Sequence, residues 1–128
     1  MLNENVVKVL KAGMWHIATC ADGVPNVVPV GFKDVTEDGK LLIGDVLMET
    51  TVKNILANNK IAISACEGKE GYQIKGTVEY VTEGPVYDKI QAMAEQLFHG
   101  AMKAKGALII TPEKVIVTTA GPDNKKEL

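Results

Sequence analysis

Turn-forming residues divide most of this chain into short apolar segments. Asp22-Gly23 and the stretches 36–39 and 67–71 each separate two such segments by the length of a hairpin loop. Strands joined by hairpins run antiparallel, and short strands that close into a barrel leave no exposed edge. The spacing therefore predicts a mainly β protein in which about seven antiparallel strands form a small barrel.

The individual strands follow from side-chain periodicity. Over residues 72–81, Tyr72, Ile74, Val78 and Tyr80 alternate with polar residues, as in a strand with one face in solvent. Short apolar runs between turn signals indicate the others. The predicted strands are residues 14–20, 24–34, 40–45, 61–66, 72–81, 107–111 and 114–119.

Three short helices are expected before and between these strands. The first begins at Asn3 or Asn5, either of which can cap it, and stops at Gly13. The other two cover residues 50–59 and 86–97, where apolar side chains recur at helical spacing.

Composition indicates a globular protein and excludes several classes of partner. The 128 residues are 46% hydrophobic and 23% charged, and we expect a single domain over residues 1–128 whose polar tail, 121–128, is loosely held. The net charge of −2 disfavours nucleic acid and anionic membranes. The apolar runs are too short to span a bilayer. No export signal is visible near the first residue, so we expect a cytoplasmic protein.

Common catalytic and metal-binding motifs are missing from the sequence. It contains two histidines, His16 and His99, and no Cys-x-x-Cys, His-Glu-x-x-His or nucleophile-elbow pattern. Cys20 and Cys66 lie far apart in apolar segments and are expected to be buried free thiols. We therefore predict no metal site and assign no catalytic residue. A protein with so few acid–base groups that does redox chemistry usually uses an organic cofactor.

One strand carries proline and glycine where a regular strand avoids them. The two prolines of residues 24–32 indicate a sheet edge or a bulge, and Gly31 would let a flat ring approach the backbone. Gly44 ends the next strand, and Thr50 and Thr51 open a helix whose N–H groups could bind a phosphate. These residues suit either a flat apolar slot beside an anion site or a kinked edge strand and an ordinary threonine cap.

Two side chains near this region are expected to serve the structure. Trp15 is expected to pack in the core or in a dimer interface rather than to stack on a ligand. Asn26, on the same strand face as Val28 and Val30, needs hydrogen-bond partners if it is buried and is expected to bridge strands.

Residues 22–32 resemble the Asp-Gly-x-Pro-x-x-x-Pro-Val signature of the pyridoxamine 5′-phosphate oxidase-like, FMN-binding split-barrel family. The same order of elements covers residues 6–119, with further likeness in residues 44–45, 50–59, 61–64 and 71–79. The resemblance implies a split β-barrel of roughly six to seven antiparallel strands with two or three short helices. It also implies a homodimer that binds FMN in grooves between its subunits.

The resemblance also implies which residues hold the cofactor. Thr50 and Thr51 correspond to the phosphate-binding pair, but the family usually has a basic residue at the first of these positions, so Thr50 removes a charge partner. Lys53, one turn further along, could replace it, as could Lys33 or Lys75. The residues implied to lie against the isoalloxazine ring are Pro29, Val30, Gly31, Gly44, Asp45 and Val46.

Three functions are consistent with this resemblance. The first is an FMN-binding redox flavoprotein that passes electrons or hydride to a partner the sequence does not identify. The vitamin oxidase activity is not expected, because the true oxidases are longer and carry extra carboxy-terminal substrate residues. The second is a non-catalytic binding module for flavin, deazaflavin, haem or pyridoxal phosphate. The third is a structural dimer without a cofactor.

Overall fold

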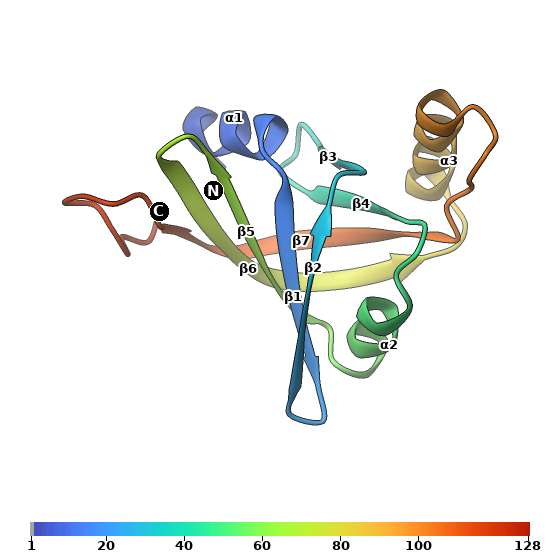
Figure 1. The fold of residues 1–128 in the computed structure, drawn as a ribbon, viewed down its shortest axis with the longest axis horizontal. Helices are drawn as coiled ribbons and strands as arrows, with labels where there is room; N and C mark the ends of the chain where they lie inside the picture. The colour runs from blue at the N-terminus through green and yellow to red at the C-terminus, as the bar shows by residue number, and fades with distance from the viewer. Residues whose placement is uncertain (1) are drawn as a thin grey trace.

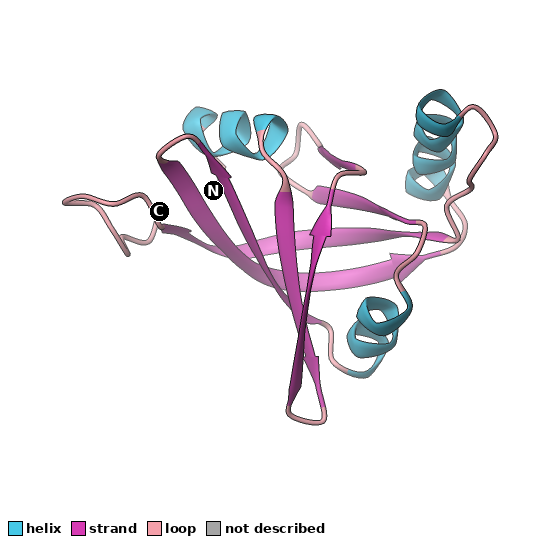
Figure 2. Ribbon diagram, in the orientation of Figure 1, coloured by secondary structure: helices cyan, strands magenta, loops and turns pink. Residues whose placement is uncertain are grey.

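A seven-stranded antiparallel sheet with three helices around it forms the fold (Figures 1 and 2). The structure is a computed structural model, and it describes residues 2–128. The order of strands across the sheet is β2-β1-β5-β6-β7-β4-β3, and the predicted mainly β, antiparallel fold is confirmed. The strands are β1 (Trp15–Ala21), β2 (Val24–Val30), β3 (Lys33–Val35), β4 (Leu41–Asp45), β5 (Lys60–Glu67), β6 (Glu70–Val81) and β7 (Gly106–Val117).

The two edge strands of this sheet, β2 and β3, are consecutive along the chain. Only Gly31 and Phe32 separate the last residue of β2 from the first residue of β3. Because three Cα–Cα steps span at most about 11 Å, the two edges must approach each other and the sheet must curl. In Figure 1 the β1–β2 hairpin accordingly crosses in front of β6 and β7. The result is a split barrel, joined at its seam by chain rather than by a β-ladder.

The edge position of β2 confirms the interpretation of its prolines. The strand pairs with β1 along one side and forms the end of the sheet. Pro25 and Pro29 lack the N–H that a second neighbouring strand would require, and so they suit an edge strand. The prediction of one strand over residues 24–34 is wrong, however, because the chain leaves one sheet edge at Gly31 and joins the other after Phe32.

The prediction of two strands within residues 107–119 is also wrong, because β7 runs through them without a break. A β-bulge accommodates the interruption, since Lys75 pairs with Lys114 while Gly76 pairs with Pro112. A Cβ atom on Gly76 would lie 2.2 Å from the carbonyl oxygen of Thr111, so this close crossing requires glycine. The two boundary errors cancel in the strand count.

The polar tail is hydrogen-bonded to β7. The N–H of Leu128 donates to the carbonyl of Val115 (2.8 Å), and the N–H of Lys125 donates to that of Val117 (2.7 Å). Because β4 pairs with β7 only as far as Ile110, this later part of β7 has a free edge that the tail can cover.

Three helices flank the sheet: α1 (Glu4–Ala12), α2 (Glu49–Ala57) and α3 (Pro85–Phe98). Asn3 caps α1 as predicted, since its Oδ1 accepts from the N–H of Val6 (3.0 Å), and the helix ends at Gly13. Figure 1 shows α1 over one end of the curled sheet, and the β4–α2 connection running between α3 and α2. No helix in residues 2–128 has the length and apolar character needed to cross a membrane.

Two apolar clusters hold these elements together. The larger one fills the inside of the curl beneath α1 and includes Trp15, which is fully buried and whose Nε1 donates to the carbonyl of Leu10 (2.8 Å). The core-packing interpretation of Trp15 is therefore confirmed. The smaller cluster joins Leu42, on the opposite face of β4, to Ile90 of α3. The expected burial of both thiols is wrong, because Cys66 is exposed and Cys20 is only half-buried; both are free.

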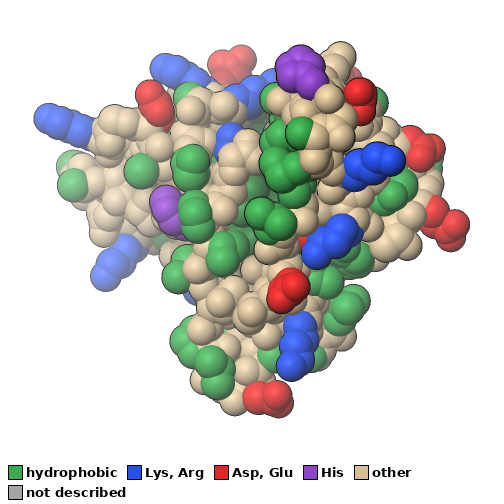
Figure 3. Space-filling view, turned by 45° about the vertical axis from the view of Figure 1, so that its right-hand side comes forward, with side chains coloured by type: hydrophobic (Ala, Val, Ile, Leu, Met, Phe, Trp, Pro, Cys, Tyr) green, Lys and Arg blue, Asp and Glu red, His purple; other side chains and the backbone are tan. Residues whose placement is uncertain are grey.

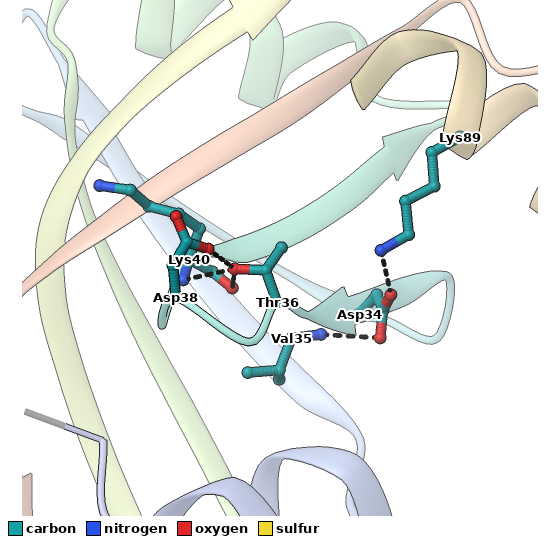
Figure 4. A network of polar contacts seen from close by, with 6 residues as sticks. All are labelled: Asp34, Val35, Thr36, Asp38, Lys40 and Lys89. Atoms are coloured by element: carbon teal, nitrogen blue, oxygen red, sulfur yellow. Dashed lines mark hydrogen bonds and ion pairs between the residues drawn. The ribbon is translucent and has the colours of Figure 1, made fainter. Parts of the chain in front are cut away.

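An ion pair also attaches α3 to the barrel (Figure 4). Lys89 of α3 lies 3.0 Å from a carboxylate oxygen of Asp34 in β3, and the other oxygen accepts from the N–H of Val35 (2.9 Å). In the adjoining hairpin, the hydroxyl of Thr36 donates to Asp38 and accepts from the N–H of Lys40 (2.9 Å). These contacts fix the short β3–β4 hairpin against α3.

Candidate functional site

Most of the predicted ring-binding residues lie together in one groove, which we call the seam groove. It has a volume of about 290 Å³ and lies where the chain passes from β2 to β3. Pro29, Val30 and Gly31 form one side, and Gly44 and Val46 form another. The structure thus brings together two strand ends that are more than ten residues apart in the sequence.

The path of the backbone at the seam explains this arrangement. The N–H of Gly44 donates to the carbonyl of Phe32 (3.1 Å), so the end of β4 lies directly beside the crossing. A Cβ atom on Gly44 would lie 2.3 Å from the ring of Phe32, and glycine is therefore required for the ring to pack there. The Phe32 ring in turn meets the edge of Phe98 from α3, with ring centroids 5.7 Å apart. These aromatic rings form the inner wall.

The walls of the seam groove are apolar and partly exposed. Leu47, on the β4–α2 connection, is 83% exposed, and Met102, beyond α3, is 40% exposed. Exposed apolar side chains around a groove are typical of a surface that binds a ligand or another protein. Figure 3 shows apolar side chains gathered in the middle of the face that carries α3 and the β4–α2 connection. Among the groove residues that the structure describes, Glu49 alone is charged.

The start of α2 differs from the prediction. Its N-cap is Met48 and makes no side-chain capping bond, so neither Thr50 nor Thr51 caps the helix. The Oδ1 of Asp45 accepts from the N–H of Met48 (3.0 Å), one residue before the helix, and so fixes the residue from which α2 starts. This contact could not be predicted from the sequence, because Asp45 lies three residues before Met48 and reaches it only through the bend of the chain after β4.

Asp45 is almost completely buried and lies behind the seam groove rather than in its lining. Its Oδ2 accepts from the hydroxyl of Tyr80 in β6 (2.5 Å). Burial, together with this hydrogen bond and the nearby carboxylate charge, raises the pKa of Tyr80 well above its usual range. Asp45 therefore holds α2 to the sheet and offers no atom to a ligand in the groove.

Thr51 lies at the floor of the groove but is already paired. Its side chain is buried, and its Oγ1 accepts from Nδ2 of Asn26 (3.3 Å). Asn26 therefore bridges β2 to α2 rather than to another strand. A second amide, that of Asn54, donates to the hydroxyl of Thr19 in β1 (3.1 Å). Both bonds fix the orientation of α2 against the β1–β2 hairpin.

The predicted cations do not line the groove. Lys53 lies with Asp45 and Lys105 in a separate cavity on the other side of the α2 N-terminus. The ammonium of Lys33 lies 5.3 Å from the centre of the Trp15 ring, where burial lowers its pKa. Lys75 lines a cavity on the outer face of the sheet.

The seam groove thus contains six of the predicted site residues and leaves out three. Asp45, Thr50 and Lys53 lie outside its lining. The sequence interpretation also missed groove residues from α3 and the β4–α2 connection, because helical periodicity does not show where a helix docks. The predicted residues that line the groove are Pro29, Val30, Gly31, Gly44, Val46 and Thr51.

Comparison with known proteins agrees with the fold. The family model described as pyridoxamine 5′-phosphate oxidase matches residues 2–120. The chain belongs to the pyridoxamine 5′-phosphate oxidase-like family. The uncharacterised protein MJ0282 of Methanocaldococcus jannaschii is 40% identical over 129 residues, which cover 98% of this chain and 86% of that protein.

Solved structures of this fold include proteins named for two different cofactors. HupZ of Group A Streptococcus has a TM-score of 0.84 and 26% identity, over 96% of this chain and 98% of that one. An FMN-binding protein from Syntrophomonas wolfei has a TM-score of 0.82 and 13% identity, over 94% of this chain and 88% of that one. HutZ, the haem storage protein from Vibrio cholerae, has a TM-score of 0.69 and 15% identity, over 91% of this chain and 94% of that one. The last two likenesses show the fold alone.

Proposed function

We propose that this chain is a flavin-binding protein that holds the isoalloxazine ring in the seam groove. One observation carries the proposal: the strand ends that the family resemblance assigns to the ring meet in a single apolar groove. FMN is the flavin that the resemblance indicates, and an FMN-binding protein shares the fold. The backbone at Gly31 leaves room for a flat ring, because a Cβ atom there would have no heavy atom within 4 Å.

The fit differs between the two parts of FMN. The groove suits the ring, since its walls are apolar and end in two aromatic side chains. It does not suit the phosphate, because no lysine lines it within the described residues and its one charged side chain, Glu49, is acidic. The proposal therefore rests on ring binding.

We further propose that the chain works as a homodimer through the outer face of β2, β1 and β5. The outward side chains of β2 at the centre of this face are Pro25, Val27 and Pro29, and Val27 is 64% exposed. Val27 pairs with Ala18, and Ala18 pairs with Ala62. The side chains in the middle of this face are therefore uncharged and small. A lack of charge at the centre is typical of protein interfaces. A second copy there would also cover the β2 edge next to the groove.

A bound flavin would supply reversible electron or hydride transfer, and the chain would contribute the binding groove. Among the described groove residues, the carboxyl group of Glu49 is the one side chain suited to exchange a proton with a substrate, and no histidine, cysteine or lysine accompanies it. This favours the redox role expected of a flavoprotein over catalysis by side chains. A non-catalytic storage role uses the same groove and differs only in whether a reductant reaches the ring.

The absorption spectrum of freshly purified protein tests this proposal. We expect flavin bands, or their appearance and quenched flavin fluorescence when the colourless protein is titrated with riboflavin or FMN. Reduction of the bound flavin by a nicotinamide nucleotide would support the redox role. A haem Soret band instead would favour the haem-binding alternative, and no binding of any flavin would contradict the proposal. Sedimentation at several concentrations tests the homodimer in parallel.

A further inference from the structure

We infer that the seam groove recognises a flavin by its ring and not by its phosphate, so that phosphate-free riboflavin binds at least as tightly as FMN. This inference rests on the proposed function and concerns the chemical class of its ligand. Four features of the chain carry it: the charge of the groove, the carboxylates near the start of α2, the absence of arginine and the positions of the lysines.

The charge of the groove opposes a phosphate. Glu49 is the first residue of α2 and lies at the groove, where it is exposed. A phosphate placed beside α2 would lie near this carboxylate, and like charges repel. The structure shows no lysine in the groove lining among residues 2–128 to offset that repulsion.

The positive end of α2 is already balanced by the chain itself. A helix N-terminus carries about half a positive charge, which is what usually attracts a phosphate. Here the buried carboxylate of Asp45 accepts from the N–H of Met48, and Glu49 adds a second carboxylate in the first turn. The hydroxyl of Thr51 is paired with Asn26. These two carboxylates offset the positive end of the helix dipole and oppose a further anion there, although they do not bond to the N–H groups of the first turn.

The chain contains no arginine, so its 14 basic residues are all lysines. The bidentate contact that most specifically binds a phosphate is therefore missing from this subunit and from any second copy. The nearest lysine along α2, Lys53, lines the cavity that contains Asp45 and Lys105 and does not line the seam groove. A lysine that a second copy placed at the groove would show as a preference for FMN over riboflavin.

The test compares two ligands that differ only in the phosphate. Quenching of flavin fluorescence gives the Kd of the full-length protein for riboflavin and for FMN in the same buffer. We expect the Kd for riboflavin to be equal to or lower than that for FMN. A charge-assisted phosphate contact would instead favour FMN by about 10- to 100-fold.

One substitution should reverse the preference. Glu49→Lys replaces the acidic group with a cation at the start of α2, and we expect FMN to bind about 10-fold more tightly while riboflavin changes little. Glu37→Lys makes the same charge change in the exposed β3–β4 turn and should leave both Kd values unchanged. This control separates a local contact at Glu49 from an effect of net charge.

The outcomes distinguish the inference from the proposed function. If FMN binds wild-type protein about 10-fold more tightly than riboflavin, the ring-only inference is wrong while flavin binding stands. If neither flavin binds, the proposed function fails and the inference fails with it. Equal binding together with the FMN gain in Glu49→Lys supports both.

Discussion

Two glycines of the seam groove have opposite surroundings. A Cβ atom on Gly44 would lie 2.3 Å from the ring of Phe32, which is packed among side chains of the smaller core cluster. A Cβ atom on Gly31 would have no heavy atom within 4 Å. Gly44 is therefore needed by the fold, whereas Gly31 is free to serve a ligand.

We predict that Gly44→Ala lowers the free energy of unfolding by about 1–3 kcal/mol, because the Phe32 ring must move out of its packed position. Gly31→Ala should leave stability unchanged or raise it slightly, since its backbone conformation is open to alanine. Urea denaturation measures both effects. Titration with riboflavin should show weaker binding for Gly31→Ala, because the methyl group is added at a residue that lines the groove. Unchanged binding would place the ring elsewhere.

A second residue-scale contact holds α2 in place. The hydroxyl of Tyr80 donates to the buried carboxylate of Asp45, which also accepts from the start of α2. We predict that Tyr80→Phe lowers the free energy of unfolding by about 1.5–3 kcal/mol, because the hydrogen bond to a charged group is lost. Tyr87→Phe is the control, since the structure shows no side-chain hydrogen bond for that hydroxyl in residues 2–128. Hydrogen exchange should show faster opening of α2 in Tyr80→Phe alone.

At the scale of elements, α3 depends on a few contacts with the barrel. Besides apolar packing, the ion pair between Asp34 and Lys89 connects it to β3 (Figure 4). Partial burial tends to raise the pKa of Asp34, but the hydrogen bond from Lys89, the Val35 N–H and the charges of Lys89 and Lys11 outweigh it. The net result is a pKa below the usual range.

The lowered pKa of Asp34 sets the direction in which stability changes with pH. Because the pKa of Asp34 is lower in the folded state, its contribution to stability is present above the ordinary aspartate value of about 3.9 and is lost as the pH falls through the folded value. We predict that Asp34→Asn lowers the free energy of unfolding by about 0.2–1 kcal/mol at pH 6, since both side chains are partly exposed. Urea midpoints from pH 6 to pH 2 should converge for the two proteins. A difference that persists in acid would assign the loss to packing.

Element types could be predicted from the sequence better than element partners. The helix cap at Asn3, the edge character of β2 and the hairpins follow from local rules about capping, proline and turns. The break at Gly31 does not follow from such local rules, because it depends on which sheet edge each half of residues 24–34 joins. The hydrogen bond from the Met48 N–H to Asp45 also escaped prediction, since it requires the bend of the β4–α2 connection.

The same reasoning explains what was predictable about the site. The strand residues Pro29, Val30, Gly31, Gly44 and Val46 belong to local motifs and lie together in the groove. Phe98 and Met102 come from the end of α3 and beyond it, and no periodicity reveals where that helix docks on the sheet. The positions of Lys53 and Thr50 depend on the rotation of α2, which Asn26 and Asn54 fix through long-range hydrogen bonds.

At the scale of the whole molecule, α3 packs on the outer face of the curled sheet at β4 and β7, but no helix in residues 2–128 packs on that face at the middle of β2, β1 and β5. The centre of this uncovered part is the row Val27, Ala18 and Ala62 across β2, β1 and β5, and an apolar-walled cavity of about 390 Å³ adjoins it. In Figure 1 no helix lies in front of the middle of the β1–β2 hairpin, and this part of the sheet is open to a second copy. The exposed edge of β2 and the rim of the seam groove border the same side.

We predict that Val27→Asp converts the proposed homodimer to a folded monomer. The side chain is 64% exposed, so the change should barely disturb the subunit, but a carboxylate buried between two copies would lack a partner. Leu97→Asp, at a 57% exposed leucine of α3, is the matched control and should remain dimeric. Sedimentation velocity gives the mass, and circular dichroism shows whether the fold is kept. If the wild-type protein is a 13.7 kDa monomer at every concentration, the interface proposal is wrong. If Val27→Asp is monomeric and also loses riboflavin binding, the second copy completes the seam groove.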